Sequence, residues 1–267
     1  MIEFEVDVQT PDGAMNTVVM HPEDGGPFPA AVCFMDSAGV RPDFLDMGRR
    51  VAAAGYCVMT PNMYYRRFRT VDIDPDRIDF DEGYEDGRAL MWELNRSFTL
   101  LDTASDTRSL LAWSDDYPHA LGGPVGAYGY CLGGRLALGV AAHVPERIAA
   151  AASFHGGGFV TDAPDSLHRH AQAIRAEVYV AHAGTDKYVA DDQLLELDRA
   201  LAAAGVRRRI EVYAEAHHGF TIAGRRVYHE RSAFRAWERL FALFRRTLPQ
   251  ARASGFAPAA DPAIVTI

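Results

Sequence analysis

The chain of 267 residues has 48% hydrophobic and 24% charged side chains. These fractions are typical of a soluble globular protein and exclude collagen-like, coiled-coil and disordered chains. Acidic residues outnumber Lys and Arg by 36 to 27, so the net charge is −9. Because nucleic acids carry a negatively charged backbone, this excess predicts no nucleic-acid partner.

The sequence also predicts a cytoplasmic protein with no membrane partner. The first five residues contain two glutamates and no basic residue, whereas a signal peptide would begin with a basic segment. No run approaches the ~20 apolar residues that a helix needs to cross a bilayer. The cysteines, Cys33, Cys57 and Cys131, are widely spaced, and an odd number without a secretion signal favours free thiols in a reducing compartment.

Short β-rich runs alternate with segments of helical periodicity, which is typical of an α/β sheet. Residues 3–8 and 16–20 flank a Thr-Pro-Asp-Gly turn and predict an antiparallel hairpin. A mostly parallel central sheet with helices on both faces is expected to follow. Its strands are expected at 29–35, 56–59, 124–128, 148–154, 178–182 and 209–213.

We expect a single domain over residues 1–248, followed by a C-terminal tail over 249–267. Residues 64–96 interrupt the α/β alternation: a basic, aromatic stretch precedes eight acidic residues between 72 and 86. This segment is interpreted either as a lid over a site or as a solvated loop leading into a helix. Its acidic residues predict no metal, because Arg77 and Gly83 replace the Gly and Glu that a calcium loop requires.

The last helix carries four aromatic side chains at helical spacing. Because such a stripe usually faces the protein interior, we expect all four in the core rather than at a cofactor. They are Phe234, Trp237, Phe241 and Phe244.

The most specific motif is Gly129-Tyr130-Cys131-Leu132-Gly133-Gly134, between an expected strand and an expected helix. A glycine-flanked nucleophile at such a junction is the nucleophile elbow of α/β-hydrolases. The strained turn exposes the nucleophile, and the helix N-terminus lowers the pKa of a thiol. No serine has this setting, so Cys131 is the candidate nucleophile.

In this class of enzyme an acid and a histidine follow the nucleophile along the chain, each in a loop after a strand. Asp186 stands after the strand at 178–182, and His217 and His218 stand after the strand at 209–213. The order alone does not choose between the two histidines.

Two backbone amides are expected to stabilise the oxyanion: that of Leu132 and one from the loop after residue 35, most simply that of Ser37. His155 lies at the carboxyl end of a strand, where open α/β sheets bind ligands, so it is expected to line the pocket.

Together these motifs resemble the dienelactone hydrolase family. The resemblance rests on the Tyr130–Gly134 elbow, on Gly184-Thr185-Asp186 and on His218-Gly219-Phe220, and it spans roughly residues 14–246. It implies an α/β-hydrolase fold and a Cys-His-Asp triad of Cys131, His218 and Asp186. It also implies hydrolysis of small esters or lactones, typically enol lactones.

The sequence departs from the family pattern at two places. Asp36 stands where the family often has a glutamate that holds the resting thiol. The arginines that bind the substrate carboxylate in the family have no matching motif here, and Arg88, Arg225 and Arg226 are the nearest in sequence. We treat Asp36, Arg88 and Arg225 as candidate substrate-binding residues.

The sequence therefore predicts a hydrolase of a small carboxylic ester or lactone that works through a thioester acyl-enzyme without a metal or cofactor. One alternative is a non-catalytic protein that binds a small ligand on the same fold. Another is a redox sensor based on Cys131, which would need a resolving cysteine nearby.

Overall fold

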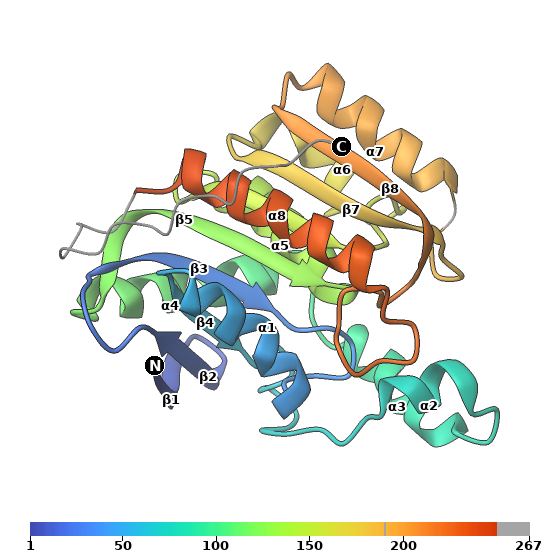
Figure 1. The fold of residues 1–267 in the computed structure, drawn as a ribbon, viewed down its shortest axis with the longest axis horizontal. Coiled ribbons are helices and arrows are strands. Elements are labelled where there is room, and N and C mark those ends of the chain that lie inside the picture. Colours follow the sequence, from blue (N-terminus) through green and yellow to red (C-terminus); the bar gives the residue numbers. More distant parts are fainter. Residues whose placement is uncertain (190, 250–267) are drawn as a thin grey trace, which may run out of the picture.

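The computed structural model describes residues 1–189 and 191–249 (Figure 1). The described strands form one eight-stranded sheet in the order β1-β2-β4-β3-β5-β6-β7-β8. β2 pairs antiparallel with β1 and β4, and all the other pairs are parallel. The strands are β1 (Ile2–Thr10), β2 (Gly13–His21), β3 (Phe28–Phe34), β4 (Cys57–Pro61), β5 (Ala120–Tyr130), β6 (Ile148–Phe154), β7 (Glu177–Thr185) and β8 (Arg208–His217).

Helices cover both faces of this sheet. α1 and α8 pack on one face, and α4 and α5 pack on the other (Figure 1). The helices are α1 (Pro42–Ala53), α2 (Pro75–Phe80), α3 (Glu85–Asn95), α4 (Leu100–Asp116), α5 (Leu132–His143), α6 (Leu167–His170), α7 (Asp191–Ala203) and α8 (Glu230–Thr247), with a 3₁₀ turn at Ala171–Ala173. The expected hairpin and mostly parallel sheet are confirmed.

The central strands are apolar because they are covered on both sides. All seven residues of β3 are buried, and so is nearly all of β6. In contrast, β1 at one edge alternates exposed and covered positions along most of its length. Because β5, β6, β7 and β8 run parallel, their carboxyl ends lie at one edge of the sheet, where loops can carry functional side chains.

The expectation that all four aromatic residues of α8 lie in the core is wrong for Phe234. Trp237 and Phe244 are fully buried and Phe241 is partly covered, but Phe234 is 56% exposed. The buried arc of the helix is centred on Ala233, Ala236, Leu240 and Leu243, and Phe234 lies to one side of it.

Residues 64–96, here called the excursion segment, contain α2 and α3 and lie beyond the carboxyl ends of the strands (Figure 1). α2 begins at an Asp74 cap, whose side chain accepts hydrogen bonds from the amides of Asp76 and Arg77. The expected tail lies, from residue 250 onward, outside the described residues. None of the helices in the described ranges is long and apolar enough to cross a membrane.

Candidate active site

Cys131 occupies a sharp turn between β5 and α5. Its φ of 54° and ψ of −116° are unusual for a residue with a side chain. A Cβ atom on Gly129 would lie 2.2 Å from the carbonyl oxygen of Gly133, and one on Gly133 would lie 2.2 Å from that of Phe34. Only glycine fits at these two positions, so the sequence closes the turn in a way that presents Cys131.

Asp186 and His218 meet beside this turn. Asp186 directly follows β7, and His218 directly follows β8. The Nδ1 of His218 donates a 2.7 Å hydrogen bond to Oδ2 of Asp186, which leaves the buried Nε2 for Cys131. The neighbouring His217 is exposed. Of the two candidate histidines, His218 is therefore the one that the fold joins to Asp186.

The electrostatics around Cys131 favour a charged pair. Burial raises the pKa of the Cys131 thiol, but the nearby His218 outweighs burial and brings this pKa below its usual value. Burial lowers the pKa of His218, yet the sulfur of Cys131 and the carboxylate of Asp186 raise it well above its usual value. At neutral pH these shifts favour a thiolate beside an imidazolium.

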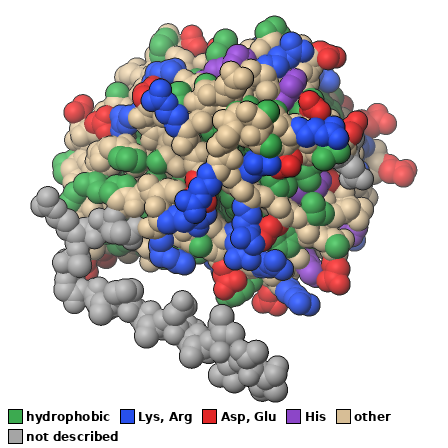
Figure 2. Space-filling model, turned by 90° about the horizontal axis from the view of Figure 1, so that it is seen from above, with side chains coloured by type: hydrophobic (Ala, Val, Ile, Leu, Met, Phe, Trp, Pro, Cys, Tyr) green, Lys and Arg blue, Asp and Glu red, His purple; other side chains and the backbone are tan. Residues whose placement is uncertain are grey.

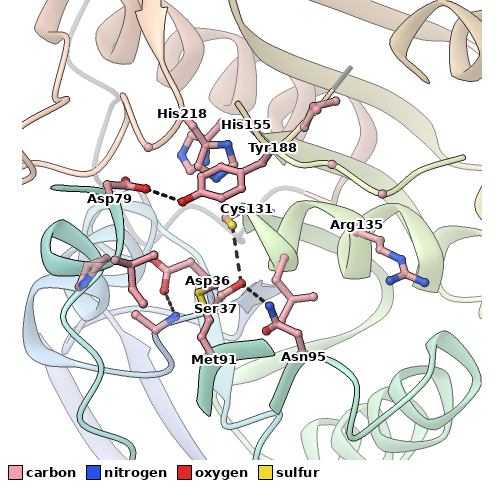
Figure 3. A pocket seen from close by; sticks show the side chains of 18 of the residues that line it. Asp36, Ser37, Asp79, Met91, Asn95, Cys131, Arg135, His155, Tyr188 and His218 are labelled. Atoms are coloured by element: carbon pink, nitrogen blue, oxygen red, sulfur yellow. Dashed lines mark hydrogen bonds between the residues drawn. The ribbon is translucent and has the colours of Figure 1, made fainter. Parts of the chain in front are cut away.

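Ser37 and Asn95 form a chain of hydrogen bonds that ends at the sulfur (Figure 3). Ser37 Oγ lies 3.7 Å from Cys131 Sγ, and Asn95 Nδ2 donates to Ser37 Oγ at 3.1 Å. The buried Tyr64 hydroxyl lies 2.7 Å from Asn95 Oδ1. Because Ser37 Oγ already accepts from Asn95, its own proton is left to point at the sulfur.

The two residues whose backbone amides are expected to stabilise the oxyanion line the same cavity as Cys131. Leu132 is the first residue of α5, and Ser37 follows β3. Neither amide hydrogen bonds to any of the described residues. Both remain available as donors.

His155 is fully buried, has a φ of 41°, and lines the cavity beside His218. The two rings lie 5.0 Å apart at a tilt of 64°, and His155 Nε2 is 2.9 Å from Oγ1 of Thr221. Burial, with a contribution from the charge of His218, holds the pKa of His155 well below its usual value. His155 is therefore a neutral ring behind His218.

A cavity of about 300 Å³ opens over Cys131. Its walls come from the strand-end loops and from the excursion segment. The excursion segment contributes side chains that sequence reasoning did not single out: Pro75, Ile78, Asp79, Met91, Trp92, Asn95 and Arg96. Tyr188 belongs to the loop that carries Asp186, and the centre of its ring lies 4.7 Å from that of His218. Its hydroxyl donates a 2.5 Å hydrogen bond to Asp79 Oδ1 (Figure 3).

Asp36 lines the cavity, but its carboxylate is held by Arg41. The two guanidinium nitrogens of Arg41 donate to its oxygens at 2.6 and 2.9 Å, and the amide of Ala38 donates at 2.9 Å. The hydrogen bond to the thiol comes from Ser37 instead.

The fold places the two arginines expected to bind substrate in different surroundings. Arg88 is not among the cavity-lining residues; it donates to the carbonyl oxygens of Ile78, Asp81 and Glu82 and so supports the excursion segment. Arg225 does line the cavity, but Asp76 and Asp79 both hold its guanidinium at 2.7 Å. The donors of Arg88 are therefore engaged away from the cavity, and the charge of Arg225 is balanced by two carboxylates.

Arg135, one turn after Cys131 on α5, is a further cavity arginine that sequence reasoning missed. It lines the cavity on the side away from the Tyr188–Asp79 pair (Figure 3). It forms no ion pair within the described residues, and its Nε is buried without a hydrogen-bond partner. Burial lowers its pKa, and only Asp165 opposes this effect. The spacing of four residues from Cys131 was the signal for it.

The other two cysteines do not support a redox role for Cys131. Cys33 and Cys57 are fully buried in β3 and β4. Burial raises the pKa of both thiols to about 12. A resolving cysteine has to be accessible and easily deprotonated, so neither residue is suited to that role.

A nucleophile elbow at the end of a mostly parallel sheet, with an acid and a histidine on later strands, places the protein among the α/β-hydrolases. Residues 15–248 match the dienelactone hydrolase family, and the chain belongs to that family. A Synechocystis relative, provisionally named carboxymethylenebutenolidase, is 27% identical over 231 residues, 84% of this chain and 88% of the relative.

Two further relatives agree with this assignment. An Escherichia coli K12 protein with the same provisional name is 26% identical and covers 90% of each chain. A crystal structure from Klebsiella pneumoniae, provisionally named a dienelactone hydrolase, has a TM-score of 0.80 and 26% identity over 92% of this chain and 98% of that one. The protein is therefore a hydrolase rather than a non-catalytic binding protein.

Proposed function

We propose that the protein hydrolyses a small carboxylic ester or lactone with Cys131 as nucleophile. The observation that carries this proposal is the convergence of an elbow cysteine with the 2.7 Å His218–Asp186 hydrogen bond in one cavity of about 300 Å³. The residues come from the ends of three different strands, as a triad on this fold requires.

In the first half-reaction, the Cys131 thiolate attacks the ester carbonyl carbon. The carbonyl oxygen becomes an oxyanion and accepts hydrogen bonds from the Leu132 and Ser37 amides. When the tetrahedral intermediate collapses, the C–O bond of the ester breaks and the leaving oxygen takes the proton from His218 Nε2. The products are an alcohol, or the opened end of a lactone, and a thioester on Cys131.

In the second half-reaction, neutral His218 removes a proton from water, and the hydroxide attacks the thioester. The C–S bond breaks, the carboxylic acid leaves, and Cys131 returns as a thiolate beside the imidazolium. Asp186 keeps the proton on Nδ1 throughout and stabilises the positive ring. The raised pKa of His218 suits the imidazolium state of the resting enzyme.

Arg135 supports a substrate that carries an anionic group. Arg135 and Arg96 are the cavity arginines without a carboxylate partner among the described residues, whereas Arg225 is neutralised by two. Arg96 stacks on the Trp92 ring, and Arg135 is the one whose Nε is buried without a partner among the described residues. A guanidinium in a partly buried site binds carboxylate strongly because its donors match both oxygens. We expect the substrate carboxylate to lie toward Arg135, with the reacting carbonyl at Cys131.

The test is hydrolysis of a panel of chromogenic esters and a dienelactone by the wild type and by Cys131→Ala and His218→Ala. Wild-type turnover is expected, with a loss of about a hundredfold or more in each variant. Thioester formation is checked by mass spectrometry of the acylated chain. If Cys131→Ala keeps wild-type turnover, or if no ester or lactone is hydrolysed, the proposal is wrong.

A further inference from the structure

A second cavity, of about 390 Å³, lies away from Cys131 and is lined mainly by arginines. We call it the arginine cleft. The face of the molecule in Figure 2 carries Lys and Arg side chains gathered around a hollow. The lining residues of the cleft are Glu177, Tyr179, Arg207, Arg208, Arg209, Arg239, Ala242 and Arg246.

The arginine cleft lies at the opposite end of the strands from the candidate active site. Glu177 is the first residue of β7, Arg208 is the first residue of β8, and Arg246 is in the last turn of α8. Cys131, in contrast, follows the carboxyl end of β5. Because β5 to β8 run parallel, the two cavities open at opposite edges of the sheet.

The cleft has more positive charge than its carboxylates neutralise. Glu177 pairs with Arg207 and Arg246, and Asp198 pairs with Arg208. Glu211 is shared by Arg209, Arg235 and Arg239. Three carboxylates thus serve six arginines, a surplus of three positive charges. In a chain with a net charge of −9, this surplus is not a consequence of a generally basic surface.

Two of these arginines are held in place by only one of their nitrogens. Arg208 donates from Nε to Asp198 at 2.7 Å, and Arg239 donates from Nε to Glu211 at 3.1 Å. Their terminal nitrogens hydrogen bond to none of the described residues. The Nε contacts fix the direction of each guanidinium and leave its outer donors available. A ligand would meet donors that are already oriented, which reduces the entropy lost on binding.

We propose that the arginine cleft binds a small molecule carrying at least two phosphate groups. A molecule with two phosphate groups presents many oxygens, and each guanidinium around the cavity can donate two hydrogen bonds to a pair of them. A surplus of three charges fits a multivalent anion better than a single carboxylate, and a cavity of this volume holds a small molecule. The inference does not depend on the proposed ester hydrolysis.

The probe is inorganic pyrophosphate, titrated into the full chain by calorimetry, with inorganic phosphate and ADP as further arms. The test variant is Arg208→Gln combined with Arg239→Gln. The matched control is Arg199→Gln, because Arg199 is exposed on α7 and does not line the cleft. Arg135→Gln reports any binding at the active-site cavity. The circular dichroism spectrum shows that each variant is folded.

We expect pyrophosphate to bind the wild type at least about tenfold more tightly than phosphate and to weaken by at least about tenfold in the double variant. Arg199→Gln and Arg135→Gln should keep the wild-type affinity. ADP binding at a similar affinity would identify a nucleotide as the source of the phosphates, and pyrophosphate binding alone would identify a free phosphate compound. Absence of binding, equal loss in Arg199→Gln, or loss in Arg135→Gln alone would overturn the proposal.

Discussion

The two walls of the active-site cavity differ in how the chain builds them. One wall consists of strand ends: Cys131 after β5, Asp186 after β7 and His218 after β8. The other is the excursion segment, whose two short helices lie outside the sheet and bring Asn95 to Ser37. The first wall is placed by strand pairing within the sheet, and the second by side-chain contacts such as the ion pairs of Asp76 and Asp79 with Arg225. The proposed reaction chemistry therefore belongs to the sheet, and the excursion segment shapes the surroundings of the nucleophile.

In the wall built from strand ends, the largest loss of activity is expected on substitution of Asp186. In Asp186→Asn the amide cannot stabilise a positive ring, so the pKa of His218 should fall and its tautomer should change. We expect kcat/KM to fall by about a hundredfold or more. The high-pH limb of the pH–rate profile should move to lower pH, because His218 loses its proton more readily.

Asp192→Asn is the matched control, since Asp192 is an exposed residue of α7 a few positions further along the chain. Its rate and pH profile should equal those of the wild type. If Asp186→Asn kept the wild-type rate, the fold would not be using this carboxylate as the triad acid.

Substitution of Arg135 is expected to have a smaller effect on catalysis, because it changes the choice of substrate rather than the reaction at Cys131. Two esters are compared that share the reacting group, one with a free carboxylate and one with a neutral amide in its place. In Arg135→Gln the preference for the charged ester should fall by about 10- to 100-fold, while hydrolysis of the neutral ester is largely kept. Steady-state kinetics of both esters measure this ratio.

Arg88→Gln is expected to behave differently, and the comparison tests whether Arg135 or the sequence-based candidate Arg88 recognises the substrate carboxylate. Arg88 was a sequence-based candidate for the same role, but it supports carbonyl oxygens of the excursion segment. Its loss should change the rates of both esters in parallel and leave their ratio unchanged. A ratio that depended on Arg88 and not on Arg135 would reverse the assignment.

The difference between the two walls also explains what the sequence could predict. Gly129 and Gly133 reveal the elbow because only glycine fits there, and strand order then places Asp186 and His218. No comparable sequence pattern marks Asn95, because its approach to Ser37 depends on how α3 packs. Arg225 looked available in sequence, but Asp76 and Asp79, almost 150 positions earlier, neutralise it. Long-range pairing of charges is invisible in a local pattern.

The smallest predicted effect would test whether the excursion segment tunes the nucleophile. In Asn95→Ala, Ser37 Oγ loses the donor that directs its proton toward Cys131 Sγ. The thiolate should lose part of its stabilisation, so its pKa should rise by up to about one unit. Activity should fall a few-fold on the acidic side, where less thiolate is present, and recover as the pH rises.

The pH dependence of Cys131 alkylation by iodoacetamide measures this pKa directly, without any substrate. Ser37→Ala should raise it by at least as much, because it removes the hydrogen bond to the sulfur that Asn95→Ala only weakens. Ser97→Ala is the control. Ser97 lies just beyond the same helix, and its hydroxyl donates to the carbonyl oxygen of Leu94 rather than to Ser37. An unchanged thiol pKa in both Asn95→Ala and Ser37→Ala would show that the excursion segment lines the cavity without tuning the nucleophile, and that the imidazole of His218 alone sets the charge of the sulfur.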